Sequence, residues 1–96
     1  MEKLIHLDSL LFPVSNVQAI SDVEQEWHGD YMFFHTVTVY LSDGRMAKWK
    51  GDRCNKTIPD WNVGCKKQAD ELRASIINSV WPDLQIIDFQ ATSEGG

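Results

Sequence analysis

The fold is constrained most strongly by residues 31–41, which read YMFFHTVTVYL. Aromatic and β-branched side chains fill most of these positions, and such side chains fit the pleated surface of a strand. The odd positions carry apolar residues together with His35, whereas Thr36 and Thr38 occupy even positions. Because successive side chains of a strand point to opposite faces, we predict a central strand whose odd face lies against the core.

Two alternating segments flank this strand. Within residues 17–27 the apolar residues Val17, Ala19, Val23 and Trp27 fall on odd positions, and Ile20 is the one apolar residue on the otherwise acidic or polar even positions. A turn around Gly29 separates this segment from the central strand, and a second turn with Gly44 precedes the short segment 45–50. Glycine between polar residues is typical of hairpin turns. The pattern therefore predicts an antiparallel meander over residues 17–50.

A helix is predicted over residues 64–80. Four apolar residues recur there with the spacing of one helical face, namely Ala69, Leu72, Ile76 and Val80. Pro82 ends the helix, and residues 51–63 have the composition of a loop. Residues 84–89, with the sequence LQIIDF, are apolar enough to form a final strand.

The complete prediction is an α+β two-layer domain. An antiparallel sheet, made of the meander and strand 84–89, packs against the one helix. Residues 1–11 fit a helix or an edge strand, and we favour the strand. We expect a single domain over residues 1–90 and a disordered tail over residues 91–96, and we assign Trp27 and Trp81 to the core.

Charge is segregated along the chain. The net charge is −6 over residues 1–44, +4 over residues 45–73 and −3 over residues 74–96, for a total of −5. Such a distribution bears on partners and association rather than on the fold. The acidic total argues against direct binding of nucleic acid, whose binders are typically basic. No stretch is apolar and long enough to span a membrane, and no signal peptide is recognised, so we expect a cytoplasmic protein.

No recognised catalytic motif is present, and we predict neither a catalytic residue nor a cofactor. Cys54 and Cys65 have neither the density of a disulfide scaffold nor the spacing of a zinc site, so we expect two free thiols and no metal. A disulfide between them stays open as the alternative. His35, on the apolar face of the central strand, is interpreted as a core residue.

We predict a small non-enzymatic module that binds another protein, as an inhibitor or regulator. Its size and charge are similar to those of small acidic inhibitors such as many phage counter-defence proteins, an analogy that rests on no motif. The expected contact surfaces are an acidic face and two tryptophans, made up of Asp22, Glu24, Glu26, Asp30, Trp49 and Trp61. Arginine and tryptophan are enriched among the residues that dominate interface energies.

Two other functions are kept open. One is binding of a nucleotide or phosphate ligand by the basic segment 45–67, with Arg53, Lys66 and Lys67 at the start of the helix. The other is an enzyme that uses Cys65 as a nucleophile, activated by the helix start and the neighbouring lysines. A homodimer is a further option, formed by pairing of an exposed edge strand across a two-fold axis.

Overall fold

The predicted central strand is present as β5 (Met32–Leu41), and every other strand of the main sheet pairs with it. The computed structural model describes residues 2–87 and 89. Thr36 pairs with both Glu24 and Lys50, so β5 has a partner on each edge. All pairings are antiparallel, which confirms an α+β fold with an antiparallel sheet and one helix.

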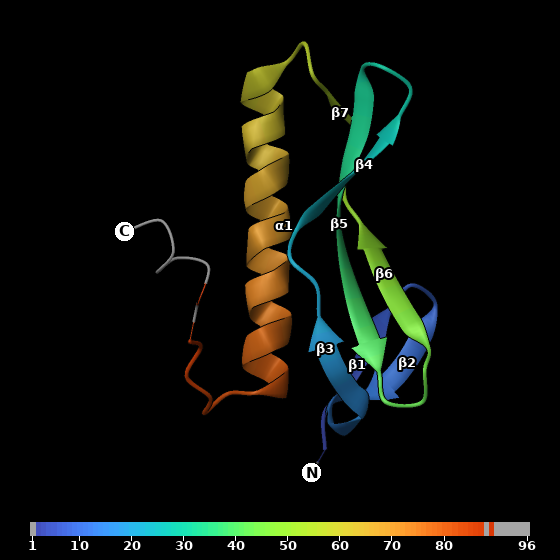
Figure 1. The fold of residues 1–96 in the computed structure, drawn as a ribbon, viewed down its shortest axis with the longest axis vertical. Helices are drawn as coiled ribbons and strands as arrows, with labels where there is room; N and C mark the ends of the chain where they lie inside the picture. The colour runs from blue at the N-terminus through green and yellow to red at the C-terminus, as the bar shows by residue number, and fades with distance from the viewer. Residues whose placement is uncertain (1, 88, 90–96) are drawn as a thin grey trace.

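Four strands surround β5. One edge of β5 pairs with two successive strands, β3 (Val17–Ile20) and β4 (Glu24–His28), and the other edge pairs with β6 (Met46–Lys50) and β7 (Cys54–Asn55). In Figure 1, β3 lies to the left of β5 while β4 lies to its right, although both pair with the same edge. The sheet is therefore strongly twisted, in keeping with the handed twist of β-strands.

The predicted strand 17–27 is divided into β3 and β4. The pairing register shifts between Val17 and Ala19, so Val17 and Ile20 lie opposite Leu41 and Val39 and share the core face. Ile20, the residue that broke the alternation, thus marks a bulge, because an extra residue in a strand reverses which positions face inward.

The helix α1 (Pro59–Val80) lies along one face of the sheet and begins five residues earlier than predicted (Figure 1). Pro59 occupies the first helical position, and Asp60 lies in the first turn. Proline is well suited to that position because its missing N–H has no partner there in any case, and an acid near the start complements the helix dipole. Residues 59–63 of the predicted loop 51–63 are therefore the start of the helix, and Cys54–Asn55 within that loop form the short strand β7.

The core lies between α1 and the odd face of β5, as predicted. Phe33, His35, Val37, Val39 and Leu41 are all buried. The helix contributes mainly three buried residues, namely Cys65, Ala69 and Ile76. Trp81 packs against the core as expected, but Trp27 is 46% exposed, which corrects its assignment to the core.

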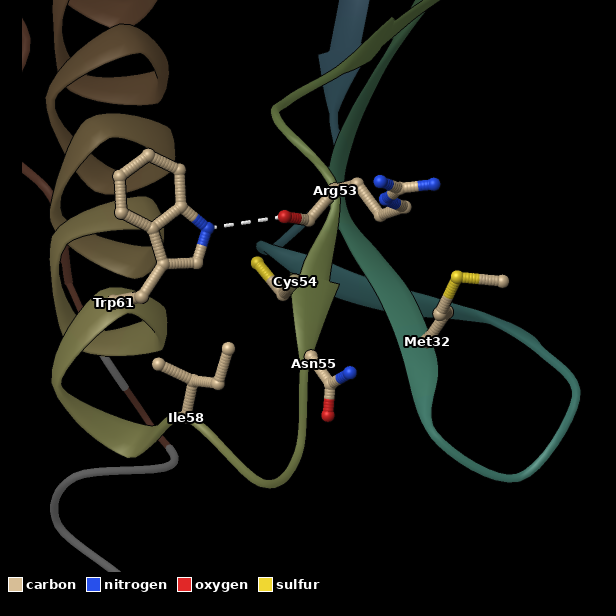
Figure 2. A pocket seen from close by; sticks show the side chains of 6 residues that line it. All are labelled: Met32, Arg53, Cys54, Asn55, Ile58 and Trp61. Atoms are coloured by element: carbon tan, nitrogen blue, oxygen red, sulfur yellow. Dashed lines mark hydrogen bonds between the residues drawn. The ribbon is translucent and has the colours of Figure 1, made fainter.

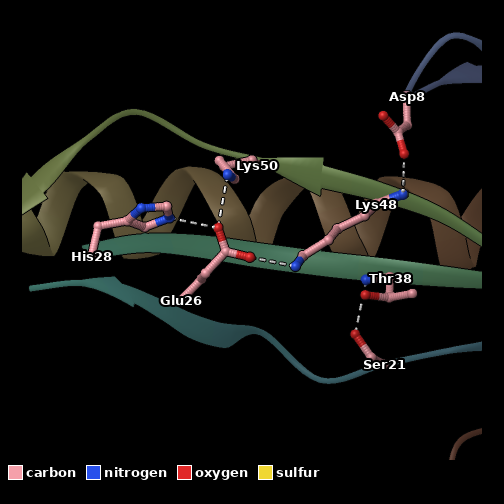
Figure 3. Close-up of polar contacts among 7 residues, drawn as sticks. All are labelled: Asp8, Ser21, Glu26, His28, Thr38, Lys48 and Lys50. Carbon is pink, nitrogen blue, oxygen red and sulfur yellow. Dashed lines mark hydrogen bonds and ion pairs between the residues drawn. The ribbon is translucent and has the colours of Figure 1, made fainter. Parts of the chain in front are cut away.

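Residues near the N-terminus form a hairpin of two strands, β1 (Leu4–Leu7) and β2 (Leu10–Pro13), as a separate two-stranded sheet. Its two-residue turn has positive φ at Asp8 (53°) and Ser9 (62°), the geometry that matches the twist of the flanking strands. Phe12 is buried in the core that also contains Ile76. A carboxylate oxygen of Asp8 accepts a hydrogen bond from the backbone N–H of Lys48 in β6 (Figure 3).

The predicted C-terminal strand is wrong for the described residues 84–87, which form no strand. Both edges of β5 are already paired, and a turn closed by the Leu84 N–H bonding to the Trp81 carbonyl redirects the chain. Figure 1 shows this segment on the side of α1 away from the sheet. Residues 88 and 90–96, which include the predicted disordered tail 91–96, lie outside the described residues.

Within residues 2–87 and 89, no helix combines the length and apolar character needed to cross a membrane.

Candidate functional site

Glu26, one of the predicted partner-binding acids, is engaged by two lysines and a histidine of its own chain (Figure 3). Its carboxylate accepts hydrogen bonds from the ammonium groups of Lys48 at 2.5 Å and Lys50 at 2.7 Å, and lies 3.0 Å from a ring nitrogen of His28. The hydrogen bonds from Lys48, then Lys50 and His28, hold the pKa of Glu26 well below its ordinary value.

This ion cluster covers the sheet face that points away from the helix. Glu26 lies opposite Phe34, and its side chain spans β5 to reach the lysines of β6. Thr36 and Thr38 beneath it are 3% and 9% exposed, although they lie on the face opposite the core. The Lys50 ammonium also lies 5.0 Å from the centre of the Phe34 ring, a cation–π distance. Glu26 therefore links β4 to β6 across the outer face of the sheet, and its carboxylate is already paired within its own chain.

The other three predicted acids do not gather into one face. Asp22, after β3, lies 3.5 Å from the guanidinium of Arg73 on the helix. Glu24 is exposed on the outer face of β4, and Asp30 is exposed in the turn between β4 and β5. Only part of the predicted acidic surface is thus available to a partner.

The two predicted tryptophans lie on the helix side of the sheet. Trp49 faces the same way as its buried partner Val37, and its ring covers Gly51, where an added Cβ would come within 2.8 Å of the indole. Trp61 lies on α1 and is 53% exposed, and its indole N–H donates to the Arg53 carbonyl at 3.0 Å. Of the two, only Trp61 offers a large free aromatic surface.

A cavity of about 480 Å³ opens beside Trp61, where the helix start meets the end of the sheet (Figure 2). It is lined by Met32, Arg53, Cys54, Asn55, Ile58 and Trp61. The side-chain amide of Asn62 fixes Asn55, which lines the cavity. The amide oxygen of Asn62 accepts a hydrogen bond from the Asn55 N–H, and its amide nitrogen donates one to the Asn55 carbonyl. The short strand β7 is thereby fixed to the first turn of the helix.

Exposed apolar side chains surround this cavity. Ile58 and Trp61 are both more than half exposed, and Met32 is 38% exposed. We call the cavity together with these three residues the cavity surface. Contiguous exposed apolar groups of this kind mark interaction sites more often than isolated ones do.

The cysteines are both buried free thiols, as expected. Burial, and then the contact with Cys65, raise the pKa of the Cys54 thiol to about 12, and its Sγ lies 3.5 Å from the Asp52 carbonyl. Cys65 is 5% exposed and lies in the second turn of α1 rather than at its start. The helix N-terminus therefore does not activate Cys65 in the way that the sequence interpretation assumed.

The three cations proposed for an anion site are dispersed. Arg53 lines the large cavity, whereas Lys66 lines a second cavity of about 270 Å³ and forms an ion pair with Asp70 at 3.0 Å. Lys66 and Lys67 lie in the third turn of α1, beyond the free N–H groups of the helix start. The anion site required these lysines at the helix N-terminus, and the early start of the helix places them beyond it.

His35 is buried as predicted, at 3% exposure, beside the second cavity. Its ring meets Phe33 edge-on at 5.3 Å, and its Nδ1 has no hydrogen-bond partner among the described residues. Burial, and then the nearby charge of Lys66, lower the pKa of His35, while Asp70 opposes the shift. The neutral ring is therefore the form that the fold favours.

Sequence reasoning missed Met32 and Ile58 as candidate site residues. Met32 sits on the exposed face at the start of the central strand, a position that alternation alone does not mark as functional. Ile58 is an isolated apolar residue directly before Pro59 in a polar stretch. An apolar side chain just before a helix start, without an apolar neighbour to cover it, was the available signal.

In residues 2–87 and 89, no group of three or more histidine, cysteine or acidic side chains is arranged to hold a metal ion.

Comparison of the chain with family models, curated proteins and solved structures found no significant match.

Proposed function

We propose that this protein is a binding module for another protein, acting as an inhibitor or regulator, and that the cavity surface makes the contact. The observation that carries the proposal is the open cavity of about 480 Å³ with exposed Ile58 and Trp61 at its rim. A concave apolar site with an exposed tryptophan can receive an apolar side chain and bury it from water.

The chemistry of the cavity defines the partner. Its wall is apolar except for Asn55, which is held by Asn62, and Arg53. The Arg53 side chain forms no ion pair or hydrogen bond with any residue in 2–87 or 89 that would neutralise it. The complementary partner segment therefore has a large apolar residue beside a carboxylate, since a guanidinium pairs well with carboxylates.

The proposal moves the main contact from the acidic strand to the cavity surface. Glu26 and Asp22 already interact with cations of the same chain, so exchanging those contacts for a partner would give little net gain. Glu24 and Asp30 stay exposed and could orient an approaching basic surface.

The two alternative functions have less support. The cations proposed for a phosphate ligand are dispersed, and the two thiols are buried, with the pKa of Cys54 raised to about 12. A thiol in that environment is a poor nucleophile because the thiolate is the reactive form.

The test is affinity capture with the purified protein as bait, in lysate of its source organism treated with nuclease. Two variants change the cavity surface, Trp61→Ala and Ile58→Ser, and Met46→Ala serves as the control. Met46 is a comparably exposed apolar residue (59%) at the other end of the sheet. We expect a protein captured by the parent and by Met46→Ala, and lost with both cavity variants.

Ile58→Ser guards against a folding artefact, because serine is a favourable residue before a helix start and keeps the fold intact. A partner that both cavity variants retain would overturn the proposal. Capture that disappears with nuclease would instead favour the basic segment as a nucleic-acid or nucleotide site.

A further inference from the structure

The segment after the helix exposes three large aliphatic side chains without a packing partner in the sheet. Leu84, Ile86 and Ile87 are 67%, 70% and 73% exposed. Isolated exposed apolar residues are ordinary, but three within four positions form a contiguous apolar segment. Its sequence favours a strand, and its own molecule has no free place for it on β5.

This segment and the cavity surface lie at opposite ends of α1. Trp61 and Val80 are separated by 19 helical residues, or about 28 Å at 1.5 Å per residue. From Val80 to Ile86 the chain can extend at most about 21 Å. The segment therefore cannot place Ile86 in the cavity of its own molecule, and Figure 1 shows it turned to the far side of the helix.

We propose that the C-terminal segment Leu84–Ile87 of one molecule occupies the cavity of a second copy, so that the chain forms a two-fold dimer. The inference rests on the cavity surface defined for the proposed function, and it assigns a second copy of the chain as an occupant of that surface. With two helices antiparallel across the axis, the helix end of each copy lies beside the helix start of the other.

Charge complements the apolar contact. Residues 74–96 contain three acids and no base, and Asp83 directly precedes the segment. The cavity presents Arg53, and Lys56 directly follows Asn55, which lines the cavity. The segment thus has the composition deduced above for a partner: large aliphatic side chains next to a carboxylate.

Symmetry makes the assembly closed. Each copy supplies one segment and one cavity, so a two-fold axis gives two identical contacts between a segment and a cavity, which we call joints. No unused site is then left to extend a chain of molecules. This arrangement differs from the edge-strand dimer considered from the sequence, since it needs no pairing between sheet edges.

Sedimentation of the full-length protein over a range of concentrations provides the test. The segment variant carries Ile86→Asp and Ile87→Asp, the cavity variant carries Trp61→Ala, and Leu11→Asp is the control at an aliphatic side chain exposed to a similar degree (62%). We expect a dimer for the parent and the control, and dissociation constants raised at least about tenfold for the segment and cavity variants.

Mixing the two weakened variants distinguishes this assembly from others. Each variant alone has no intact joint, whereas a mixed dimer has one, formed by the cavity of the segment variant and the segment of the cavity variant. We therefore expect the mixture to associate more tightly than either variant alone. Circular dichroism of each variant verifies its fold, and Ile58→Ser replaces Trp61→Ala if that variant unfolds.

Three results would overturn the inference: a parent that stays monomeric at its solubility limit, a segment variant that dimerises like the parent, or a mixture that gains nothing. None of these contradicts the proposed function, which depends on capture of a foreign protein by the cavity surface. Conversely, a dimer with intact joints and no foreign partner would overturn the proposed function and leave the dimer standing.

Discussion

At the scale of single residues, Glu26 illustrates how a fold can change the meaning of a charge. Along the sequence it belongs to an acidic strand, whereas in space it joins Lys48 and Lys50 from a basic one. The pairing depends on the register of two strands that both flank β5. Spacing along the chain does not reveal that register, so the acid could be identified from the sequence but its partners could not.

Replacing Glu26 by glutamine should lower the melting temperature at neutral pH and matter progressively less in acid. The lowered pKa of Glu26 means that its stabilising effect is complete above the ordinary glutamate pKa of roughly 4.3 and is lost as pH falls below that value towards the folded-state pKa. Thermal unfolding of parent and variant, followed from pH 7 down to the acid limit of folding, measures this difference.

Glu24→Gln is the matched control, because Glu24 lies on the same face of the same strand without an ion pair among the described residues. We expect it to change the melting temperature much less at neutral pH. A difference between the parent and Glu26→Gln that stays constant down to strong acid would contradict the assignment.

At the scale of elements, the apolar pattern of α1 predicted its buried face and its end correctly. Its start was misplaced because Pro59, Asp60 and Asn62 suit a loop as well as a first helical turn. What decides between them is the exchange of hydrogen bonds between Asn62 and Asn55, a contact with β7. The cavity depends on that contact, so its position could not be derived from local preference.

Two glycines of neighbouring elements should respond oppositely to alanine. At Gly51, after β6, an added Cβ would lie 2.8 Å from the Trp49 ring, so the ring must move and the free energy of unfolding should fall by about 1–3 kcal/mol. At Gly64, inside α1, an added Cβ meets nothing within 4 Å, and alanine should raise the free energy of unfolding by about 0.5–1 kcal/mol.

Urea denaturation of the two variants against the parent gives both values. A Gly51→Ala variant as stable as the parent would show that the Trp49 ring can move aside without loss of stability. A Gly64→Ala variant less stable than the parent would contradict the open space observed around that position.

At the scale of the whole molecule, the segregation of charge in the sequence does not become two charged faces. β5 lies between the acidic strand β4 and the basic strand β6, and their long side chains meet above it. The α+β class, the central strand and the helix were predictable because each follows from a local period. The charge pattern failed as a guide to surfaces because it depends on which strands become neighbours.

The N-terminal hairpin should be essential to the stability of the whole molecule, although it pairs with no strand of the main sheet. Phe12 is 1% exposed and shares a cluster with Leu41 and Ile76. Phe12→Ala should therefore lower the free energy of unfolding by about 3–5 kcal/mol, a large part of the stability of a small domain.

Leu11, the exposed neighbour of Phe12 on β2, provides the comparison, and Leu11→Ala should stay within about 0.5 kcal/mol of the parent. Chemical denaturation monitored by tryptophan fluorescence and by circular dichroism measures both. A small effect of Phe12→Ala, with the two signals changing at different denaturant concentrations, would mean that the hairpin unfolds separately.

The turn of the same hairpin has a consequence for how the protein behaves in a crowded solution. The Asp8 carboxylate accepts the outward N–H of Lys48, on the side of β6 that β5 does not cover. A strand of another molecule that added to this edge of β6 would need that N–H as a hydrogen-bond donor, and it would also meet a negative charge there. We therefore expect the turn at Asp8 and Ser9 to hinder the addition of strands from other molecules to β6.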